Sequence, residues 1–420
     1  QLARVEGEGA LRVEVTDGVV TDVELRIFEP PRFFEGFLRG RAHTEPPDIT
    51  ARICGICPVA YQMSSCAAIE DLCGVAVTPE VRALRRLLYA GEWIESHALH
   101  VYLLHAPDFL GYENGIALAA DHRATVEMGL RLKKLGNELM EVVGGRAIHP
   151  VNVRVGGFYK APACTALRAL LPALEQARAD ALETVQWVAG FSFPEVEVAA
   201  ELVALEHPGE YPVMGERIVS SEGLDIAVQE WPEHFREGHV ARSTALHSHR
   251  TGGGHYLTGP LARYTLFSDR LAPVARAAAE EAGLGATCRN PFRSIVVRSV
   301  ETLHAVDEAI RLIDDYVPPQ PPAVDVPPRA GEGHGASEAP RGLLYHRYRC
   351  DAGGLITEAQ IVPPTSQNQP AIEDDLRAVA QRFLDAPHDE LVQRCETAVR
   401  NHDPCISCAT HFLTVEVLRR

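Results

Sequence analysis

Two Cys-x-x-Cys pairs, near opposite ends of the chain, are the residues best suited to chemistry. Cys54 and Cys57 lie in the segment RICGIC, and Cys405 and Cys408 lie in the segment DPCISCATH. Because two residues separate the thiols of each pair, both thiolates of a pair can point at one metal ion. Four thiolates select zinc, iron–sulfur clusters or other thiophilic metals. The sequence therefore predicts a metal site, provided that the fold brings the two ends of the chain together.

A structural zinc site is the simplest alternative, and the spacing argues against it. A zinc ribbon usually carries its two Cys pairs within about 15–20 residues of each other, whereas these pairs lie near the two ends. Structural zinc also stabilises mainly small domains, and a chain of 420 residues can build an ample hydrophobic core. We expect the other cysteines to be small buried hydrophobic residues in a reducing compartment: Cys66, Cys73, Cys164, Cys288, Cys350 and Cys395.

The composition is that of a soluble globular protein, with 46% hydrophobic and 23% charged residues. The formal net charge of −17 argues against binding to nucleic acid or to anionic membrane surfaces. No run of about 18 uncharged apolar residues is present, so we expect no transmembrane anchor. The start at Gln1 lacks the apolar segment of a signal peptide, so we expect a cytoplasmic protein.

Apolar residues recurring at intervals of three and four predict several helices that pack as a bundle. One helix starts at Thr78, where Thr is an N-cap and Pro79 suits the first helical position. The expected helical segments are residues 78–107, 121–143, 165–188, 270–282, 299–316 and 372–401, the last with a break at Pro387.

Strands are expected near the N-terminus and in the C-terminal third. Alternating apolar residues flank Asp17-Gly18, a strong hairpin signal. A second pair is expected over residues 342–348 and 355–361, whereas the Pro- and Gly-rich residues 316–336 are expected to form an extended surface segment. The prediction is a mainly helical α+β fold. We expect one interwoven domain over residues 1–420, with a large central helix bundle and both Cys pairs meeting at its core.

Six motifs, in order along nearly the whole chain, resemble those of the large subunit of nickel–iron hydrogenases. Chance agreement of one motif is plausible, but ordered agreement of all of them is not. The motifs are Arg4-Val5-Glu6-Gly7; Arg32-Phe33-Phe34-Glu35-Gly36-Phe37 before RICGIC; Ser96-His97-Ala98-Leu99-His100 through Pro107-Asp108-Phe109; Gly144-Gly145-Arg146, His149-Pro150 and Gly156-Gly157; Glu338-Ala339-Pro340-Arg341-Gly342; and Val362-Pro363-Pro364-Thr365 with Asn368.

The resemblance implies a binuclear centre. Cys54 and Cys405 are then terminal nickel ligands, and Cys57 and Cys408 bridge nickel to an iron that carries carbonyl and cyanide ligands. A guanidinium at Arg341 can hydrogen-bond cyanide and, by resemblance, sits next to the open metal position. The residues implied to line the pocket of the diatomic ligands are Pro340, Arg341, Pro363 and Thr365.

Heterolytic cleavage of dihydrogen releases a proton, for which the resemblance implies Cys405 as first acceptor. Glu6 then carries the proton outward, and Asp108 and Asp403 complete a canopy of charged groups above the site. Without this resemblance, the sequence favours an ordinary carboxylate on a strand surface for Glu6, and Asp403 could equally be a simple turn residue. Glu35 and His411 resemble the residues that hold a magnesium or similar cation, which needs further oxygen ligands.

Two departures from the family pattern stand out. Tyr61 occupies the position where many members have His, and RICGICPVAYQMS resembles the cytoplasmic NAD(P)-linked, sulfhydrogenase-like branch. Family maturation cuts after the His of the second Cys motif, yet residues 412–420 follow His411 here. The chain is then either a precursor or a protein that keeps its tail.

The leading reading is a hydrogenase large subunit that passes electrons to an iron–sulfur small subunit, because the chain has no further Cys clusters of its own. By resemblance a flavin subunit passes the electrons on to NAD(P), and a maturation protease and nickel-insertion proteins act on the chain. The alternatives are a metal-free, quinone-binding complex-I-like subunit and a structural or metal-sensing protein with four thiolates. The complex-I relative has lost the four Cys ligands, which argues against the first alternative.

Overall fold

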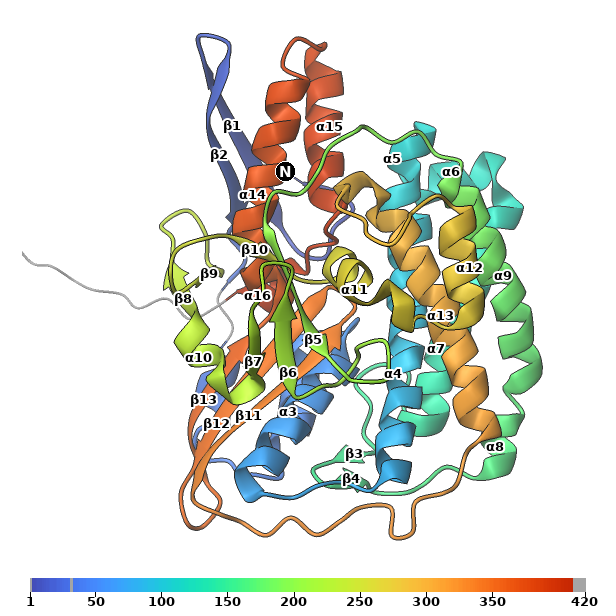
Figure 1. Ribbon diagram of the computed structural model, residues 1–420, viewed down its shortest axis with the longest axis vertical. Helices are drawn as coiled ribbons and strands as arrows, with labels where there is room; N and C mark the ends of the chain where they lie inside the picture. Colours follow the sequence, from blue (N-terminus) through green and yellow to red (C-terminus); the bar gives the residue numbers. More distant parts are fainter. Residues whose placement is uncertain (1, 31–32, 411–420) are drawn as a thin grey trace, which may run out of the picture.

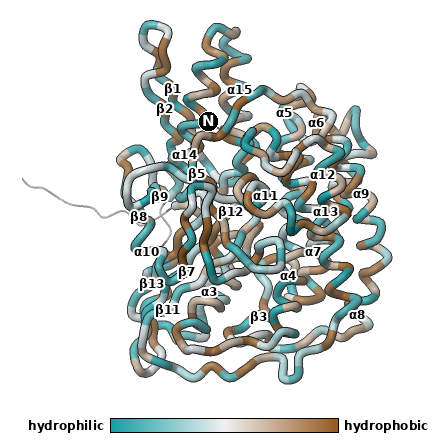
Figure 2. Tube along the Cα trace, viewed as in Figure 1, coloured by the Kyte–Doolittle hydropathy of each residue, from teal (hydrophilic) through white to brown (hydrophobic). Residues whose placement is uncertain are grey.

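The computed structural model describes residues 2–30 and 33–410 and places a helix bundle beside a mixed layer of strands and helices (Figure 1). This confirms the predicted mainly helical α+β class. The bundle contains α4 (Pro79–Leu99), α7 (Arg123–Gly144), α9 (Leu171–Ala189), α12 (Pro273–Glu281) and α13 (Ser294–Asp314). Apolar and polar residues alternate along these helices in Figure 2, as expected for helices that each turn one face to a shared core.

Two glycines allow close packing at the centre of the bundle. A Cβ on Gly136 of α7 would lie 2.6 Å from the carbonyl oxygen of Gly91 on α4, so a larger residue would push the helices apart. The helix α4 therefore passes tightly between α7 and the rest of the molecule. This packing fixes α4, which contributes Glu92 and Glu95 to the interior.

The other helices mostly belong to the second layer and to the projecting end of the molecule. Two of them, α14 and α15, form the segment predicted as one helix with a break at Pro387. The helices outside the bundle are α1 (Phe34–Leu38), α2 (Pro46–Thr50), α3 (Pro58–Cys73), α5 (Ala106–Leu110), α6 (Gly115–Asp121), α8 (Cys164–Arg168), α10 (Trp231–His234), α11 (Pro260–Phe267), α14 (Pro364–Arg382), α15 (His388–Arg400) and α16 (Ile406–Ala409), with a π-helix at His100–His105 and 3-10 turns at Ala51–Ile53, Val228–Glu230, Ser268–Arg270 and Pro291–Arg293.

The strands of residues 2–30 and 33–410 form five small sheets. The predicted hairpin around Asp17-Gly18 is confirmed, and both turn residues have positive φ, as such a turn requires. The sheets are β1 (Gly9–Thr16) with β2 (Val19–Ile27); β3 (Val153–Arg154) with β4 (Gly157–Phe158); β8 (Phe235–His239) with β9 (Leu246–Arg250); the order β10 (Tyr256–Leu257), β5 (Glu201–Glu206), β6 (Arg217–Ser220), β7 (Asp225–Ala227); and the meander β11 (Gly331–Ala339), β12 (Gly342–Cys350), β13 (Ile356–Val362).

Part of the segment expected on the surface, residues 316–336, belongs to the interior. Residues 331–336 begin β11, which packs directly on α3. A Cβ on Gly335 would lie 2.5 Å from the carbonyl oxygen of Ser64, so the glycines serve close approach of the strand to the helix rather than a flexible surface loop. The expectation of an extended surface segment is wrong for these residues.

The two ends of the chain meet. Glu6 forms a parallel β-bridge with Cys405, and the hairpin β1–β2 packs against α14. In Figure 1 this hairpin, α14 and α15 project together from one end of the molecule. The largest hydrophobic cluster reaches from Leu38 to Cys408 and includes all four cysteines of the two pairs. No helix among the described residues is both long and apolar enough to span a bilayer.

Candidate metal centre

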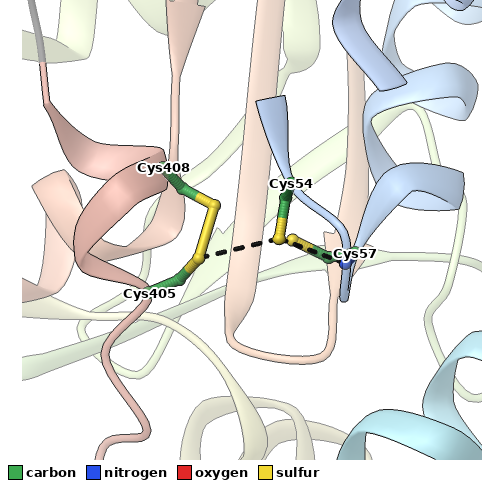
Figure 3. Close-up of side chains that lie close together, drawn as sticks. All are labelled: Cys54, Cys57, Cys405 and Cys408. Carbon is green, nitrogen blue, oxygen red and sulfur yellow. Dashed lines mark hydrogen bonds between the residues drawn. A yellow bond between two sulfur atoms is a disulfide. The ribbon is translucent and has the colours of Figure 1, made fainter. Parts of the chain in front are cut away.

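The sulfur atoms of the two Cys pairs converge on one buried point (Figure 3). The four Sγ atoms of Cys54, Cys57, Cys405 and Cys408 all lie within 4.8 Å of one another. Cys54 follows a 3-10 turn and Cys57 precedes the first residue of α3, while Cys405 directly precedes the short helix α16 and Cys408 lies within it. The central prediction from the sequence, that the ends of the chain bring both pairs together, is confirmed.

The two early cysteines differ in acidity. The sulfur of Cys54 accepts hydrogen bonds from the backbone amides of Ile56 and Cys57, each at 3.3 Å. A side-chain hydrogen bond from Cys57 and the charge of Arg341 lower the pKa of Cys54, although burial opposes them. The same contact with Cys54 and burial raise the pKa of Cys57 well above its usual value. Cys54 therefore ionises first.

The late pair is joined by a disulfide between Cys405 and Cys408. Its sulfurs are nevertheless next to the early pair, because Cys54 Sγ lies 3.7 Å from Cys405 Sγ. Metal ions bind thiolates, so two electrons must reduce this disulfide before both late sulfurs can serve as ligands. The remaining eight cysteines of the described residues are free, and six of them are buried. Of the six cysteines outside the two pairs, Cys73 and Cys164 are only partly buried, so the expectation of a buried hydrophobic role is wrong for these two.

Two of the three guanidinium nitrogens of Arg341 contact Asp403. Its Nε donates to the carbonyl oxygen of Asp403 at 2.8 Å, and its Nη2 pairs with Asp403 Oδ1 at 3.1 Å. Its Nη1 is buried and has no hydrogen-bond partner among residues 2–30 and 33–410. Burial lowers the pKa of Arg341, but Asp403 and the Cys57 thiolate more than offset this effect, so the guanidinium keeps its charge.

The turn that carries Arg341 is held from both sides. Arg263 donates from Nη1 to the carbonyl oxygen of Ala339 at 2.9 Å and from Nη2 to that of Pro340 at 3.1 Å. A Cβ on Gly259 would lie 2.6 Å from the carbonyl oxygen of Arg341, so only glycine fits there. Sequence reasoning missed Arg263, which has no motif around it and acts through chain segments distant in sequence.

Glu6 and Thr365 contact the late Cys pair directly. The carboxylate Oε2 of Glu6 lies 3.1 Å from Cys405 Sγ and accepts from the amide of Ser407 at 3.0 Å. The hydroxyl of Thr365 accepts from the amide of Cys405 at 3.0 Å. Pro363 lies beside Cys408 in the lining of a small cavity of about 30 Å³. The structure thus brings these predicted residues together at the sulfur cluster.

Glu35 lines the same small cavity as Cys408 and Pro363, and its Oε1 accepts from the amide of Ile361 at 2.8 Å. Its predicted companion in a cation site, His411, lies outside the described residues. A cavity of this size can hold one water molecule or ion. The cation site therefore remains a prediction that rests on the position of Glu35 beside the cysteines.

Asp108 makes its strongest contacts with two arginines. It pairs with Arg400 through both oxygens, at 2.7 and 2.8 Å, and also with Arg4. Arg400 in turn donates to the carbonyl oxygen of Ala3 at 2.9 Å. Asp108 therefore ties the N-terminal segment to α15, and its link to the sulfur cluster passes through the segment that carries Glu6.

Replacing Asp108 with asparagine is expected to destabilise the protein by about 3–5 kcal/mol, because it leaves the buried charge of Arg400 without its bidentate partner. Chemical denaturation monitored by circular dichroism measures this free energy of unfolding. The matched control is Asp307→Asn, which breaks a half-exposed pair with Arg178 and should cost less than about 1 kcal/mol. Equal effects of the two substitutions would contradict the anchoring role of Asp108.

Sequence reasoning also missed Glu92 of α4. Its carboxylate is fully buried and accepts from the amides of Val59 and Ala60, at 2.6 and 3.2 Å, in the first turn of α3. An acidic residue between apolar neighbours in a predicted helix was the available signal, but it does not reveal which backbone the acid meets.

Comparison with known proteins gives one consistent result. The family model for nickel-dependent hydrogenase matches residues 32–138 and 286–411. Sulfhydrogenase 1 subunit alpha of Pyrococcus furiosus is 33% identical over 98% of this chain and 97% of its own length. The NAD-reducing hydrogenase HoxS subunit beta of Cupriavidus necator is 28% identical over 98% of this chain and 94% of its own. The solved structure of an NAD⁺-reducing [NiFe]-hydrogenase in the H₂-reduced state superposes with a TM-score of 0.87 at 28% identity, covering 98% of both chains.

The donor set agrees with this result. Four buried cysteine sulfurs, with the late pair reduced, suit a thiophilic metal, and the unsatisfied Nη1 of Arg341 suits an anionic ligand at such a centre. The residues present therefore fit a nickel–iron site. A metal-free, quinone-binding role has no use for such a cluster and is not favoured. The chain belongs to the nickel-dependent hydrogenase family and is a hydrogenase large subunit.

Proposed function

We propose that this chain cleaves and forms dihydrogen at a nickel–iron centre held by its four converging cysteines. The observation that carries the proposal is the convergence of four buried sulfur atoms from opposite ends of the chain. In this assignment Cys54 and Cys405 would hold nickel, and Cys57 and Cys408 would serve both nickel and iron. Such a centre, with carbonyl and cyanide on its iron, would supply Lewis acidity toward dihydrogen.

Arg341 orients the groups that face the centre. Asp403 holds its guanidinium at Nε and Nη2, which leaves the buried Nη1 to donate to a cyanide ligand. Pro340, Pro363 and Thr365 exclude water from this side, and the Thr365 hydroxyl fixes the amide of Cys405.

Glu6 takes the proton from the sulfur of Cys405. A carboxylate oxygen 3.1 Å from Sγ is within reach for a direct transfer. Ser407 Oγ donates to Glu29 Oε2 at 2.9 Å, and the amide of Glu8 donates to Glu29 Oε1, so Glu29 is the next acidic group outward. In the proposal Asp108 positions Glu6 indirectly, by anchoring Ala3 and Arg4 through its arginine pairs.

A hard cation, magnesium or similar, is proposed between Glu35 and His411. Glu35 supports this assignment because it lies beside the late Cys pair. Carboxylate and backbone carbonyl oxygens are the ligands that such a cation prefers.

Electrons are proposed to leave through an iron–sulfur small subunit. Ile148, 52% exposed, packs next to Gly55 between the early cysteines, and Val151 follows at 42%. Phe33 and Phe37 are also exposed beside Phe34, which lines the same cavity as Ile53. Exposed apolar side chains around the early Cys pair suit a partner surface close enough for electron transfer.

The proposal extends to a wider assembly. The NAD-reducing relatives support electron transfer to NAD(P), and we propose a flavin subunit for this step and a cytoplasmic location for the enzyme. A maturation protease and nickel-insertion proteins are part of the same proposal.

Metal analysis of the purified protein tests the function. We expect nickel and iron in equal amounts, together with infrared bands of carbonyl and cyanide, because the four thiolates suit this pair of metals. Zinc alone would instead favour a structural site, and a protein without metal that retains all four free thiols would favour the quinone-binding alternative.

A further inference from the structure

Glu92 differs from the other buried carboxyl groups. Within the described residues, every other buried Asp or Glu forms an ion pair with an Arg, Lys or His side chain, as Glu70 does with Arg85 and Glu301 with Arg263. Glu92 has no such basic partner in residues 2–30 and 33–410, although its exposed fraction is 0%. A buried carboxyl without a cation costs stability and needs another reason to be present.

The partners of Glu92 are backbone amides next to the metal ligands. The helix α3 begins one residue after Cys57, and Cys57 gives no side-chain cap. Glu92 reaches across from α4 and accepts from Val59 at 2.6 Å and from Ala60 at 3.2 Å. The two preceding amides, of Ile56 and Cys57, are already taken by the sulfur of Cys54.

The backbone amides at the start of α3 thus bind two different acceptors: two of them donate to the sulfur of a metal ligand, Cys54, and two donate to the carboxylate of Glu92. A helix N-terminus carries partial positive charge and favours an anion. Because Cys54 and Glu92 share this terminus, a shift of Glu92 changes both the direction of the Cys54–Cys57 loop and the charge near it.

We infer that Glu92 is a positioning residue for the nickel–iron centre: it caps α3 from the neighbouring helix, fixes the loop that carries Cys54 and Cys57, and sets the charge next to that loop. This inference rests on the proposed function. It adds a residue from α4 that none of the sequence motifs contains.

Burial and the neighbouring amides act on the pKa of Glu92 in opposite directions. Burial raises its pKa well above the usual value and the Cys54 thiolate raises it further, whereas the amides of Val59 and Ala60 lower it. The other ionisable groups that act with it are Glu95 on its own helix, and Tyr89 and Cys57, whose pKa values are raised. Bound metal cations favour the ionised carboxylate, which satisfies both amide donors.

Glu92→Gln keeps the shape of the side chain but removes its charge and one acceptor. In the holoenzyme we expect normal nickel and iron content, a carbonyl infrared band at higher frequency, and hydrogen uptake reduced about tenfold, as for other residues that orient metal ligands. Loss of a nearby negative charge withdraws electron density from the iron and so weakens its back-donation to the carbonyl. The control Glu95→Gln lies one turn further along α4, where Lys133 pairs with it at 3.4 Å and it makes no contact with the amides of α3, and it should shift the band less than Glu92→Gln does.

A second measurement uses the metal-free chain and does not depend on activity. In Glu92→Leu, backbone amides in residues 57–63 should exchange with deuterium faster, by mass spectrometry, than in the unsubstituted chain. A wild-type carbonyl band and wild-type uptake in Glu92→Gln would overturn the inference, as would unchanged exchange in Glu92→Leu. Absence of nickel from the unsubstituted protein would instead overturn the proposed function.

Discussion

Cys405→Ser is expected to abolish hydrogen uptake, with a loss of more than about 100-fold, because even residues that merely orient a metal ligand typically cost 10–100-fold. The sulfur of Cys405 occupies the junction of the site: it lies 3.7 Å from Cys54 Sγ and 3.1 Å from the carboxylate of Glu6. Serine removes both a soft ligand and the first proton acceptor. Hydrogen-dependent dye reduction and nickel analysis of the same preparation measure the two losses.

The matched control is Cys395→Ser. Cys395 is also buried, at 6% exposure, but it lies on α15 in the hydrophobic cluster with Leu376 and Val399, away from the other thiols. It should keep its nickel and most of its activity, apart from a modest loss of stability. Retained hydrogen uptake in Cys405→Ser, at a level similar to Cys395→Ser, would remove Cys405 from the centre.

The elements with a polar face could be predicted from the sequence. The hairpin at Asp17-Gly18 and the amphipathic helices α4, α7 and α9 appeared close to their expected positions, because each exposes one side to water and so shows a period in its residues. The boundaries were less accurate, since α13 begins at Ser294 rather than at residue 299. Helix α14 begins at Pro364, well before the expected start at residue 372.

The helix α3 could not be found in this way. Nearly all of its residues are buried, from Pro58 to Leu72, because it packs against β11 on one side and other elements around it. A helix without a solvent-facing side has no polar stripe, so periodicity carries no signal. The strand β11 was not predicted for a related reason. Its glycines allow close contact with α3, but glycine-rich sequence is also typical of a linker.

The residues of the candidate site also differ in whether the sequence could identify them. The four cysteines could be identified by their spacing and Arg341 by its motif, because the local sequence contains that information. The roles of Glu92 and Arg263 depend on backbone groups from other elements, which only the fold brings near. For Asp108 the expected place above the centre stays a prediction, and the fold adds ion pairs with Arg4 and Arg400 that its motif did not reveal.

Glu6→Gln is expected to slow hydrogen uptake by roughly 10²–10⁴-fold while nickel and iron stay bound, because an amide cannot take up the proton that a general base accepts. The structure makes this substitution selective. The amide oxygen of glutamine can still accept from the backbone N–H of Ser407, which Glu6 Oε2 now does at 3.0 Å, and the bond from the amide of Ile406 to the backbone oxygen of residue 6 is unaffected. The late Cys pair therefore keeps its position.

The measurement compares hydrogen uptake with exchange between dihydrogen and deuterated solvent, together with the infrared bands of the centre. Uptake and exchange should fall together while the bands stay in place, since both require the proton to leave Cys405. Glu8→Gln is the matched control, because Glu8 is exposed two residues further along the same segment and should retain full activity. A Glu6→Gln protein that has lost its metals would make Glu6 a structural support of the Cys405–Cys408 turn, and one with normal exchange would place the proton route elsewhere.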